Sequence, residues 1–229
     1  KYISSANIAC GFHAGDPHVM NRTVELAAKG KVSVGAHPSF NDLIGFGRRK
    51  IDMDPKKVKN IMTYQIGALD AFARSHGLKL QHVKPHGALN NMASTDYDLA
   101  QAIAKAIKEV NQDLIFVALG GSEMYKAAQD QGLRAASEVF ADRAYNKDGT
   151  LVSRKYEGAV LEDPAVVKKR VLRMVKDGEV ETINGELLKV KADTVCVHGD
   201  NPEAVELVQE LTSELKNNNV KITPMRDIV

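Results

Sequence analysis

The amino-acid sequence predicts an α/β protein built on a parallel sheet. Short runs rich in Val, Ile, Leu and Ala alternate with stretches of helical periodicity along the chain. Strands that alternate with helices pair in parallel, because a parallel neighbour is reached through a crossover connection. The chain has 229 residues, 44% of them hydrophobic. A single domain with one core, such as an α/β barrel, is typical at this length.

Local sequence places the individual elements. The runs expected to form strands are NIAC (7–10), VSVGA (32–36), LQHV (80–83), LIFVAL (114–119), ASEVFA (136–141) and TVCV (194–197), with VKIT (220–223) as a further candidate. Four helix starts join a side-chain acceptor to a following proline: Asp16-Pro17, Asp54-Pro55, Asp163-Pro164 and Asn201-Pro202. Between two strand-like runs, Asn184-Gly185 predicts a small β-hairpin insertion.

The sheet could be open or closed into a barrel. The absence of nucleotide-binding motifs favours the closed form. The Gly-rich stretch LGGS (119–122) lacks the G-x-G-x-x-G spacing, and no P-loop sequence occurs. The sequence therefore favours a barrel over an open, dinucleotide-binding sheet. In either arrangement a ligand binds at the carboxyl ends of the strands.

Composition limits the kinds of partner and the cellular compartment that we expect for this chain. The net charge is +2 and both signs are mixed throughout, so we expect no nucleic-acid partner. No apolar run is long enough to span a bilayer, so we expect no membrane association. Cys10 and Cys196 lie in apolar runs, which favours free thiols in a reducing cytoplasm. The first element begins abruptly at Lys1, and we expect a preceding strand in the native protein.

Ionisable side chains recur at the ends of the predicted strands. Four of the seven histidines follow such runs, namely His13, His37, His86 and His198. Carboxylates lie close to the same ends, namely Asp16, Glu138, Asp142 and Asp200. We expect these groups to converge on one rim, because the carboxyl ends of parallel strands share an edge. The remaining histidines, at positions 18, 76 and 82, are assigned no role.

Two chemistries fit such a rim, and the spacing does not choose between them. Neutral imidazoles with one or two carboxylates could hold a divalent transition metal that keeps an open position. Without a metal, the same groups could act as general acid and base. Lys84 could bind an anion or neutralise an aspartate. Arginines suited to clamping an acidic substrate lie on nearby loops, although surface roles are more common for any single one.

Seven motifs occur in order over nearly the whole chain: SANIACGFHAGDP, GAHPSF with GFGRR, YQIGAL, HVKPHGAL, EVFADRAY, GTLV before Arg154, and CVHGD. This series resembles the LamB/YcsF family, described as the A component of 5-oxoprolinase. The resemblance implies a distorted seven-stranded parallel β/α barrel, TIM-like and similar to that of polysaccharide deacetylases. It also implies ATP-dependent hydrolysis of the lactam amide of 5-oxo-L-proline to L-glutamate, together with partner subunits B and C.

The motif positions carry functional roles over to this chain. We assign catalysis to His13, Asp16, Lys84, His86, Asp142, His198 and Asp200. We assign substrate binding to Asn7, Arg48, Arg49, Arg143 and Arg154. If a metal binds, its expected ligands are His13, His37 and His86. ATP with Mg²⁺ is expected to be used mainly with the partner subunits.

The chain departs from the family pattern at three places. The acidic first strand of the family does not precede Tyr2, Asn90-Asn91 stands where Tyr-Asn is usual, and Ser153 replaces a proline. The first two departures remove carboxylates and an aromatic contact from the expected site. Two other interpretations stay open: a stand-alone metal-dependent hydrolase of the deacetylase type, and a non-catalytic protein that binds the lactam or serves as a scaffold. Homo-oligomer formation is compatible with all three.

Overall fold

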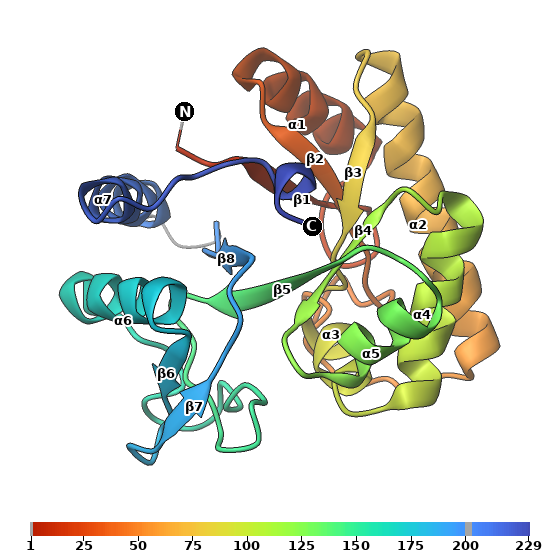
Figure 1. The fold of residues 1–229 in the computed structure, drawn as a ribbon. Helices are drawn as coiled ribbons and strands as arrows, with labels where there is room; N and C mark the ends of the chain where they lie inside the picture. Colours follow the sequence, from red (N-terminus) through yellow and green to blue (C-terminus); the bar gives the residue numbers. More distant parts are fainter. Residues whose placement is uncertain (1, 200–202) are drawn as a thin grey trace.

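A computed structural model describes residues 2–199 and 203–229, and it confirms the α/β fold with a parallel sheet (Figure 1). Six strands form the sheet in the order β1-β2-β3-β4-β5-β8. Every pairing between these neighbours is parallel. The strands are β1 (Ser5–Ala9), β2 (Ser33–His37), β3 (Leu80–Val83), β4 (Ile115–Leu119), β5 (Ala135–Phe140) and β8 (Thr194–Cys196).

The sheet curls into a half-barrel, and its strand count differs from the seven that the resemblance implied. Within the described ranges, β1 and β8 are the two edges of the sheet and are not paired with each other. Residues 220–223, the further strand candidate, form no strand. The chain is held there by side-chain packing instead, because buried Met225 contacts Ile115, Val117 and Ala136.

Helices follow most of the strands, and three of the predicted starts are confirmed. The helices are α1 (Pro17–Gly30), α2 (Pro55–Ser75), α3 (Gly87–Ala93), α4 (Tyr97–Val110), α5 (Glu123–Asp130), α6 (Pro164–Lys176), α7 (Ala204–Asn217) and a 3₁₀ turn, η1 (Met225–Asp227). The side chains of Asp16, Asp54 and Asp163 accept hydrogen bonds from backbone N–H groups of the first turns of α1, α2 and α6. The fourth predicted start, at residues 201–202, lies outside the described residues.

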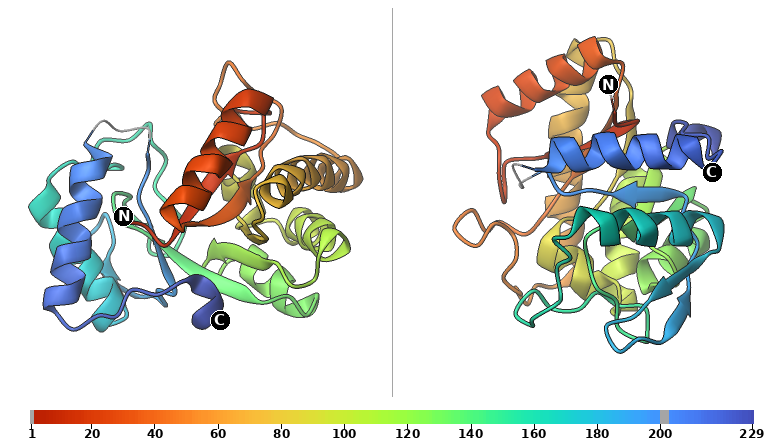
Figure 2. Two further views of the ribbon diagram at one scale, coloured as in Figure 1. Left: turned by 90° about the horizontal axis from the view of Figure 1, so that it is seen from above. Right: turned by 90° about the vertical axis from the view of Figure 1, so that its left-hand side faces the viewer.

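The apolar core has two main parts on the outside of the half-barrel. Helices α1, α2, α4 and α5 pack around β1 to β4, where Ile66, Ile103 and Phe116 are fully buried (Figure 1). Helices α6 and α7 lie side by side next to β5 and β8 and bury Val171 and Leu211 (Figure 2). This division leaves the concave face of the sheet to polar side chains such as Asn7 and Lys84 and to the small apolar cluster around Met225.

The predicted hairpin insertion is confirmed after α6. Strands β6 (Glu179–Glu181) and β7 (Leu187–Lys189) pair antiparallel. Gly185 adopts φ +83° in the connecting turn, a conformation that favours glycine. Of the helices that the structure describes, none is long and apolar enough to cross a membrane.

Candidate functional site

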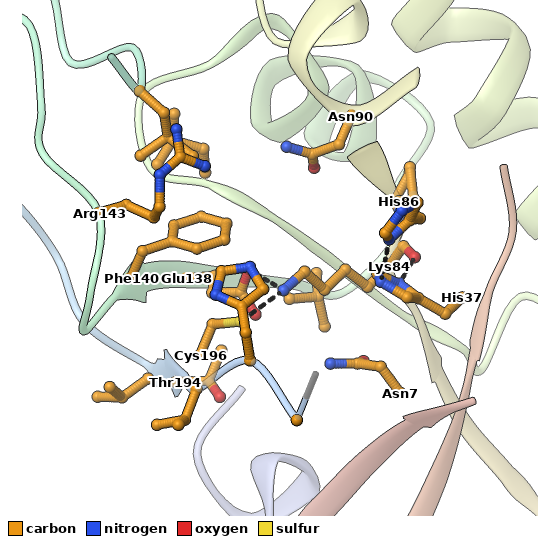
Figure 3. Close-up of a pocket in the computed structure, with 18 of the residues that line it drawn as sticks. Asn7, His37, Lys84, His86, Asn90, Glu138, Phe140, Arg143, Thr194 and Cys196 are labelled. Carbon is orange, nitrogen blue, oxygen red and sulfur yellow. Dashed lines mark hydrogen bonds and ion pairs between the residues drawn. The ribbon is translucent and has the colours of Figure 1, made fainter. Parts of the chain in front are cut away.

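A cavity of about 1910 Å³ opens on the concave face of the half-barrel (Figure 3). It is lined from β1, β2, β4, β5 and β8 and from loops at the strand ends, including the one that follows β3. Asn7, His37, Lys84, His86 and Arg143 all contribute to its wall. The expected convergence on one rim is therefore seen for most of the predicted residues.

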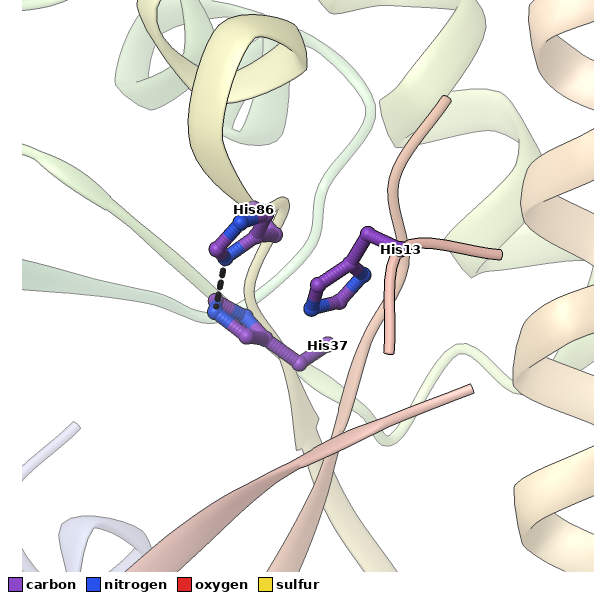
Figure 4. Close-up of side chains that lie close together, drawn as sticks. All are labelled: His13, His37 and His86. Carbon is purple, nitrogen blue, oxygen red and sulfur yellow. Dashed lines mark hydrogen bonds between the residues drawn. The ribbon is translucent and has the colours of Figure 1, made fainter. Parts of the chain in front are cut away.

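Three of the predicted histidines form one cluster (Figure 4). His13 follows β1, His37 ends β2 and His86 follows β3. One ring nitrogen from each lies within 4.8 Å of the other two. The rings of His13 and His86 are stacked, with their centroids 3.8 Å apart and their planes 7° from parallel. These three imidazoles are the predicted metal ligands.

A glycine makes this cluster compact. Gly47 adopts φ +65°, and a Cβ at this position would lie 2.9 Å from Cβ of His13 and 2.9 Å from Cδ2 of His86. Its carbonyl accepts a hydrogen bond from the backbone N–H of Ala88 at 2.8 Å. The loop after β2 therefore packs directly on the imidazoles, which only glycine permits here.

Backbone carbonyls fix the protons on two of the rings. Nδ1 of His37 lies 2.6 Å from the carbonyl oxygen of Lys84, and Nε2 of His86 lies 2.8 Å from that of Phe46. A carbonyl oxygen only accepts, so both of these nitrogens carry the proton. In the neutral rings, Nε2 of His37 and Nδ1 of His86 then carry lone pairs, and they face each other at 3.0 Å.

Burial keeps all three imidazoles neutral. It lowers the pKa of His13 to about 3, with further contributions from His86 and Arg48. It lowers the pKa of His86 to about 4 and that of His37 well below its ordinary value, where the Lys84 ammonium adds to the effect. Neutral imidazole is the form that coordinates metal ions.

A buried charged pair lies beside the cluster. Nζ of Lys84 is 2.6 Å from Oε2 of Glu138 and 3.0 Å from Sγ of Cys196, and it lies over the Phe140 ring (Figure 3). Burial alone would lower the pKa of Lys84, but Cys196 and Glu138 hold it above its ordinary value. Lys84 is therefore an ammonium group that Glu138 neutralises. Burial raises the pKa of the Cys196 thiol to about 12, so it is not a nucleophile.

A histidine–aspartate pair completes the opposite wall. Nδ1 of His198 lies 3.0 and 3.1 Å from the two carboxylate oxygens of Asp142. Burial raises the pKa of Asp142, but His198 outweighs burial and lowers it. A carboxylate that accepts from Nδ1 leaves Nε2 with a lone pair. His198 lines the cavity, whereas Asp142 lies behind it, so the pair has the geometry of an oriented general base.

The predicted arginines differ in their surroundings. Arg143 is buried, and its guanidinium donates to the carbonyl oxygens of Ala159 and Val152. Burial, with Arg154 next, lowers the pKa of Arg143 to about 10. Arg49 pairs with the Asp42 carboxylate, with Nε 2.8 Å from Oδ1. Arg143 therefore offers a fixed cation to the cavity, whereas the charge of Arg49 is already matched.

Arg48 and Arg154 lie on two loops that line the cavity. The guanidinium of Arg48 stacks over the Phe46 ring at 4.9 Å from its centroid. Arg154 is exposed on the loop that follows Val152, and its charge contributes to lowering the pKa of Asp142. Both arginines are therefore close enough to act on an anion bound in the cavity.

One predicted catalytic carboxylate, Asp16, is not brought to this site. Asp16 is exposed and does not line the cavity; its carboxylate caps α1 through the N–H groups of His18 and Val19. Asp200 lies outside the described residues. The structure thus gives Asp16 a structural role, whereas Glu138 lines the cavity and Asp142 lies behind His198.

Sequence reasoning gave no role to His82 and none to Glu138 as the partner of Lys84. His82 is buried and its Nε2 lies 2.9 Å from Oδ1 of Asn7, a predicted substrate-binding residue. Period-two alternation along β3 places His82 on the same face as Lys84. The same alternation along β5 places Glu138 on the face of Phe140. This signal was present in the sequence at both positions.

Fold and site together define an α/β half-barrel protein with a polar pocket at the carboxyl ends of its strands. Within that class, the chain belongs to the LamB/YcsF family, whose model matches residues 1–229. A relative from Clostridium beijerinckii, named as the A component of 5-oxoprolinase, is 55% identical over 100% of this chain and 89% of its own length. One of the same name from Pyrococcus horikoshii is 53% identical over 100% of this chain and 90% of its own length.

One solved structure agrees with this assignment, and a second shares only the fold. The "Lactam Utilization Protein" of Thermus thermophilus superposes with a TM-score of 0.91 at 43% identity, covering 97% of this chain and 89% of that one. A protein of Enterococcus faecalis gives a TM-score of 0.52 at 12% identity over 91% of this chain and 83% of its own. The second likeness is one of fold alone.

Proposed function

We propose that this chain is the A component of a 5-oxoprolinase, which opens the lactam ring of 5-oxo-L-proline to give L-glutamate. The names of its full-length relatives support the substrate and the existence of partner subunits. The observation that carries the proposal is the His198–Asp142 pair, with His198 on a cavity wall that also presents Lys84 and Arg143. These are the groups that hydrolysis of a small acidic amide requires.

The reaction is water addition followed by ring opening. Nε2 of His198 takes a proton from water as the water oxygen adds to the lactam carbonyl carbon. Lys84 stabilises the negative charge that develops on the lactam oxygen. A metal ion, which His13, His37 and His86 would hold, would supply Lewis-acid stabilisation of the same charge. The ring C–N bond then breaks, and the nitrogen leaves as an amine with the proton returned by His198. Asp142 orients the imidazole throughout.

The arginines that face the cavity hold the substrate carboxylate in this proposal. Arg143 is the best placed, because its guanidinium is fixed by two carbonyl groups and is buried. Arg48 and Arg154 add positive charge from two loops that line the cavity. Asn7 of β1 is held by a hydrogen bond with His82. In this proposal Asn7 contacts the lactam ring of the substrate.

Partner subunits B and C supply the ATP-dependent step. An unactivated amide is a poor electrophile, and we assign ATP with Mg²⁺ to activation of its carbonyl oxygen with those subunits. The cysteines Cys10 and Cys196 are free and buried, which is consistent with localisation in the reducing cytoplasm. A homo-oligomer of this chain within the assembly is compatible with the proposal.

A second candidate function is a metal-dependent amide hydrolase that acts without partner subunits. The observation that favours it is the cluster of three neutral imidazoles. It predicts lactam or acetamide hydrolysis by the isolated chain with added metal. Dependence of glutamate production on ATP and on the partner subunits would favour the 5-oxoprolinase function instead.

The proposal is tested by glutamate production from 5-oxo-L-proline with subunits B and C and ATP present. His198→Ala is expected to lower kcat by about 10²-fold or more, because the proton acceptor is lost. Asp142→Asn is expected to lower kcat by a similar factor and to alter the pH profile. His18→Ala, on the exposed start of α1, is the matched control and keeps full activity.

Two results would contradict the assignment. If folded His198→Ala and Asp142→Asn proteins both made glutamate at the wild-type rate, this pair would have no catalytic role. If the chain also bound 5-oxoproline unchanged in those variants, a binding or scaffold function would replace the catalytic one.

A further inference from the structure

We infer that His13, His37 and His86 bind a single divalent transition metal ion. The three side chains come from successive strand ends, and their nitrogens lie within 4.8 Å of one another (Figure 4). The cluster lines the cavity, so a ligand can reach it. The inference stands on the hydrogen-bond geometry of the imidazoles and does not depend on the lactam reaction.

The first argument is the number of protons. His37 and His86 each donate one N–H to a backbone carbonyl, which leaves a lone pair on the other nitrogen. Those two nitrogens are 3.0 Å apart with no proton to place between them. Two lone pairs at hydrogen-bond distance repel each other, so the arrangement requires a shared cation.

A proton is the weaker candidate for that cation. It would create a buried imidazolium close to the Lys84 ammonium and the Arg48 guanidinium, both of which oppose it. A metal ion forms bonds to three nitrogens at once, whereas a proton bridges only two.

The third imidazole supplies the second argument. His13 is 3% exposed, and its buried Nδ1 has no hydrogen-bond partner among the described residues. A polar atom in this situation normally finds a partner in the protein or an ordered water. His13 is instead held by stacking on His86 and by edge contacts with His37 and Phe46. Its ring is thus positioned by packing and not by hydrogen bonds to the protein.

The ligand set selects the class of ion. Three neutral nitrogens suit Zn²⁺, Co²⁺ or Ni²⁺, whereas Mg²⁺ and Ca²⁺ prefer oxygen ligands. The carbonyl groups of Lys84 and Phe46 orient two of the rings through their N–H groups, as outer partners do in histidine metal sites. The cavity leaves room for a fourth ligand from solvent or substrate.

The separations also fit. Two nitrogens bound to one tetrahedral ion lie roughly 3.3 Å apart when each bond is about 2.0 Å. The His37–His86 separation of 3.0 Å is close to this value. The nitrogens of the three histidines lie within 4.8 Å of one another, which is wider than this value. A bound ion would therefore draw the His13 nitrogen inward. Metal binding thus requires the His13 ring to turn out of its stack on His86.

The test is metal binding by untagged, full-length protein. Metal content is measured after purification, and Co²⁺ is then titrated into chelator-treated protein while the visible absorption of four-coordinate Co²⁺ is recorded. We expect about one equivalent of Co²⁺, displaced by Zn²⁺. His86→Ala and, separately, His13→Asn are expected to weaken Co²⁺ binding by at least about 100-fold. His18→Ala is the matched control and binds Co²⁺ as the wild type does.

Circular dichroism establishes that each variant is folded, and either folded variant suffices for the test. Absence of Co²⁺ and Zn²⁺ binding to the wild-type protein would overturn the inference. So would binding that His86→Ala and His13→Asn leave unchanged, because the ion would then lie elsewhere. The readout needs no turnover, so a metal site without lactamase activity and lactamase activity without a metal site are distinguishable outcomes.

Discussion

The two sides of the cavity bury polar side chains in opposite ways. On the side of β1 and β2, the His13, His37 and His86 cluster is uncharged, and no carboxylate joins it among the described residues. On the side of β5 and β8, each carboxylate has a partner: Glu138 pairs with the Lys84 ammonium, and Asp142 accepts a hydrogen bond from Nδ1 of His198. The same strand-end geometry thus produces electron-pair donors suited to a cation on one side and fixed charges suited to proton transfer on the other.

The uncharged side predicts the largest effect, a steep loss of stability in acid. Burial lowers the pKa of His13 and His82 to about 3 and that of His86 to about 4, and it also lowers the pKa of His37. In the unfolded chain these groups titrate near 6.5. The unfolded state therefore binds protons first as the pH falls. The stability is full above about pH 6.5 and decreases toward the folded-state values.

Each such histidine costs about 1.4 kcal/mol per pH unit in this window. Four together would consume a typical stability of about 5 to 15 kcal/mol within roughly two pH units. Urea unfolding of the metal-free protein between pH 7.5 and pH 4.5 measures the slope. His82→Asn should reduce it by one histidine's share. An unfolding free energy that stays constant from pH 7 to pH 5 would contradict this account of the cluster.

The charged side predicts a smaller effect that depends on which partner is removed. Glu138→Ala leaves the Lys84 ammonium buried without its carboxylate, and we expect a loss of about 3 to 5 kcal/mol in the free energy of unfolding. The double variant Lys84→Met with Glu138→Leu removes both charges and should be the more stable of the two. Urea unfolding at pH 7.5 compares them. Equal destabilisation by both would show that packing, and not the unpaired charge, sets the cost.

Much of the fold could be predicted because its signals are local. The helices that begin after Asp16, Asp54 and Asp163 are each marked by the proline that follows the aspartate. Asn184-Gly185 likewise marks the hairpin. Residues 220–223 look like a strand, yet pairing depends on what lies beside them, which one segment does not contain. The burial of Met225 against β4 and β5 is a contact between distant parts of the chain.

The site was predicted in outline and not in detail for the same reason. The three clustered histidines and His198 follow strands, so their convergence follows from topology. The partners of the charged residues do not. Glu138 is 54 residues from Lys84 along the sequence, and the pairing of Arg49 with Asp42 depends on the fold of a loop. A helix cap and a catalytic carboxylate also look alike in sequence, which is why Asp16 was assigned to catalysis.

Substitution of Asp16 is expected to have the smallest effect of the three. It contrasts most clearly with substitution of the buried carboxylate on the charged side of the cavity. Asp16→Ala removes the acceptor for the N–H groups of His18 and Val19, which lie 2.7 and 2.9 Å from Oδ1. We expect Tm to fall by about 2 to 4 °C, as for loss of a helix cap, with glutamate production within about two-fold of wild type. Asp54→Ala is the matched control, because Asp54 caps α2 outside the cavity. If Asp16→Ala lost activity while Asp54→Ala, with the same fall in Tm, did not, the Asp16 carboxylate would act in the reaction and would not be only a cap.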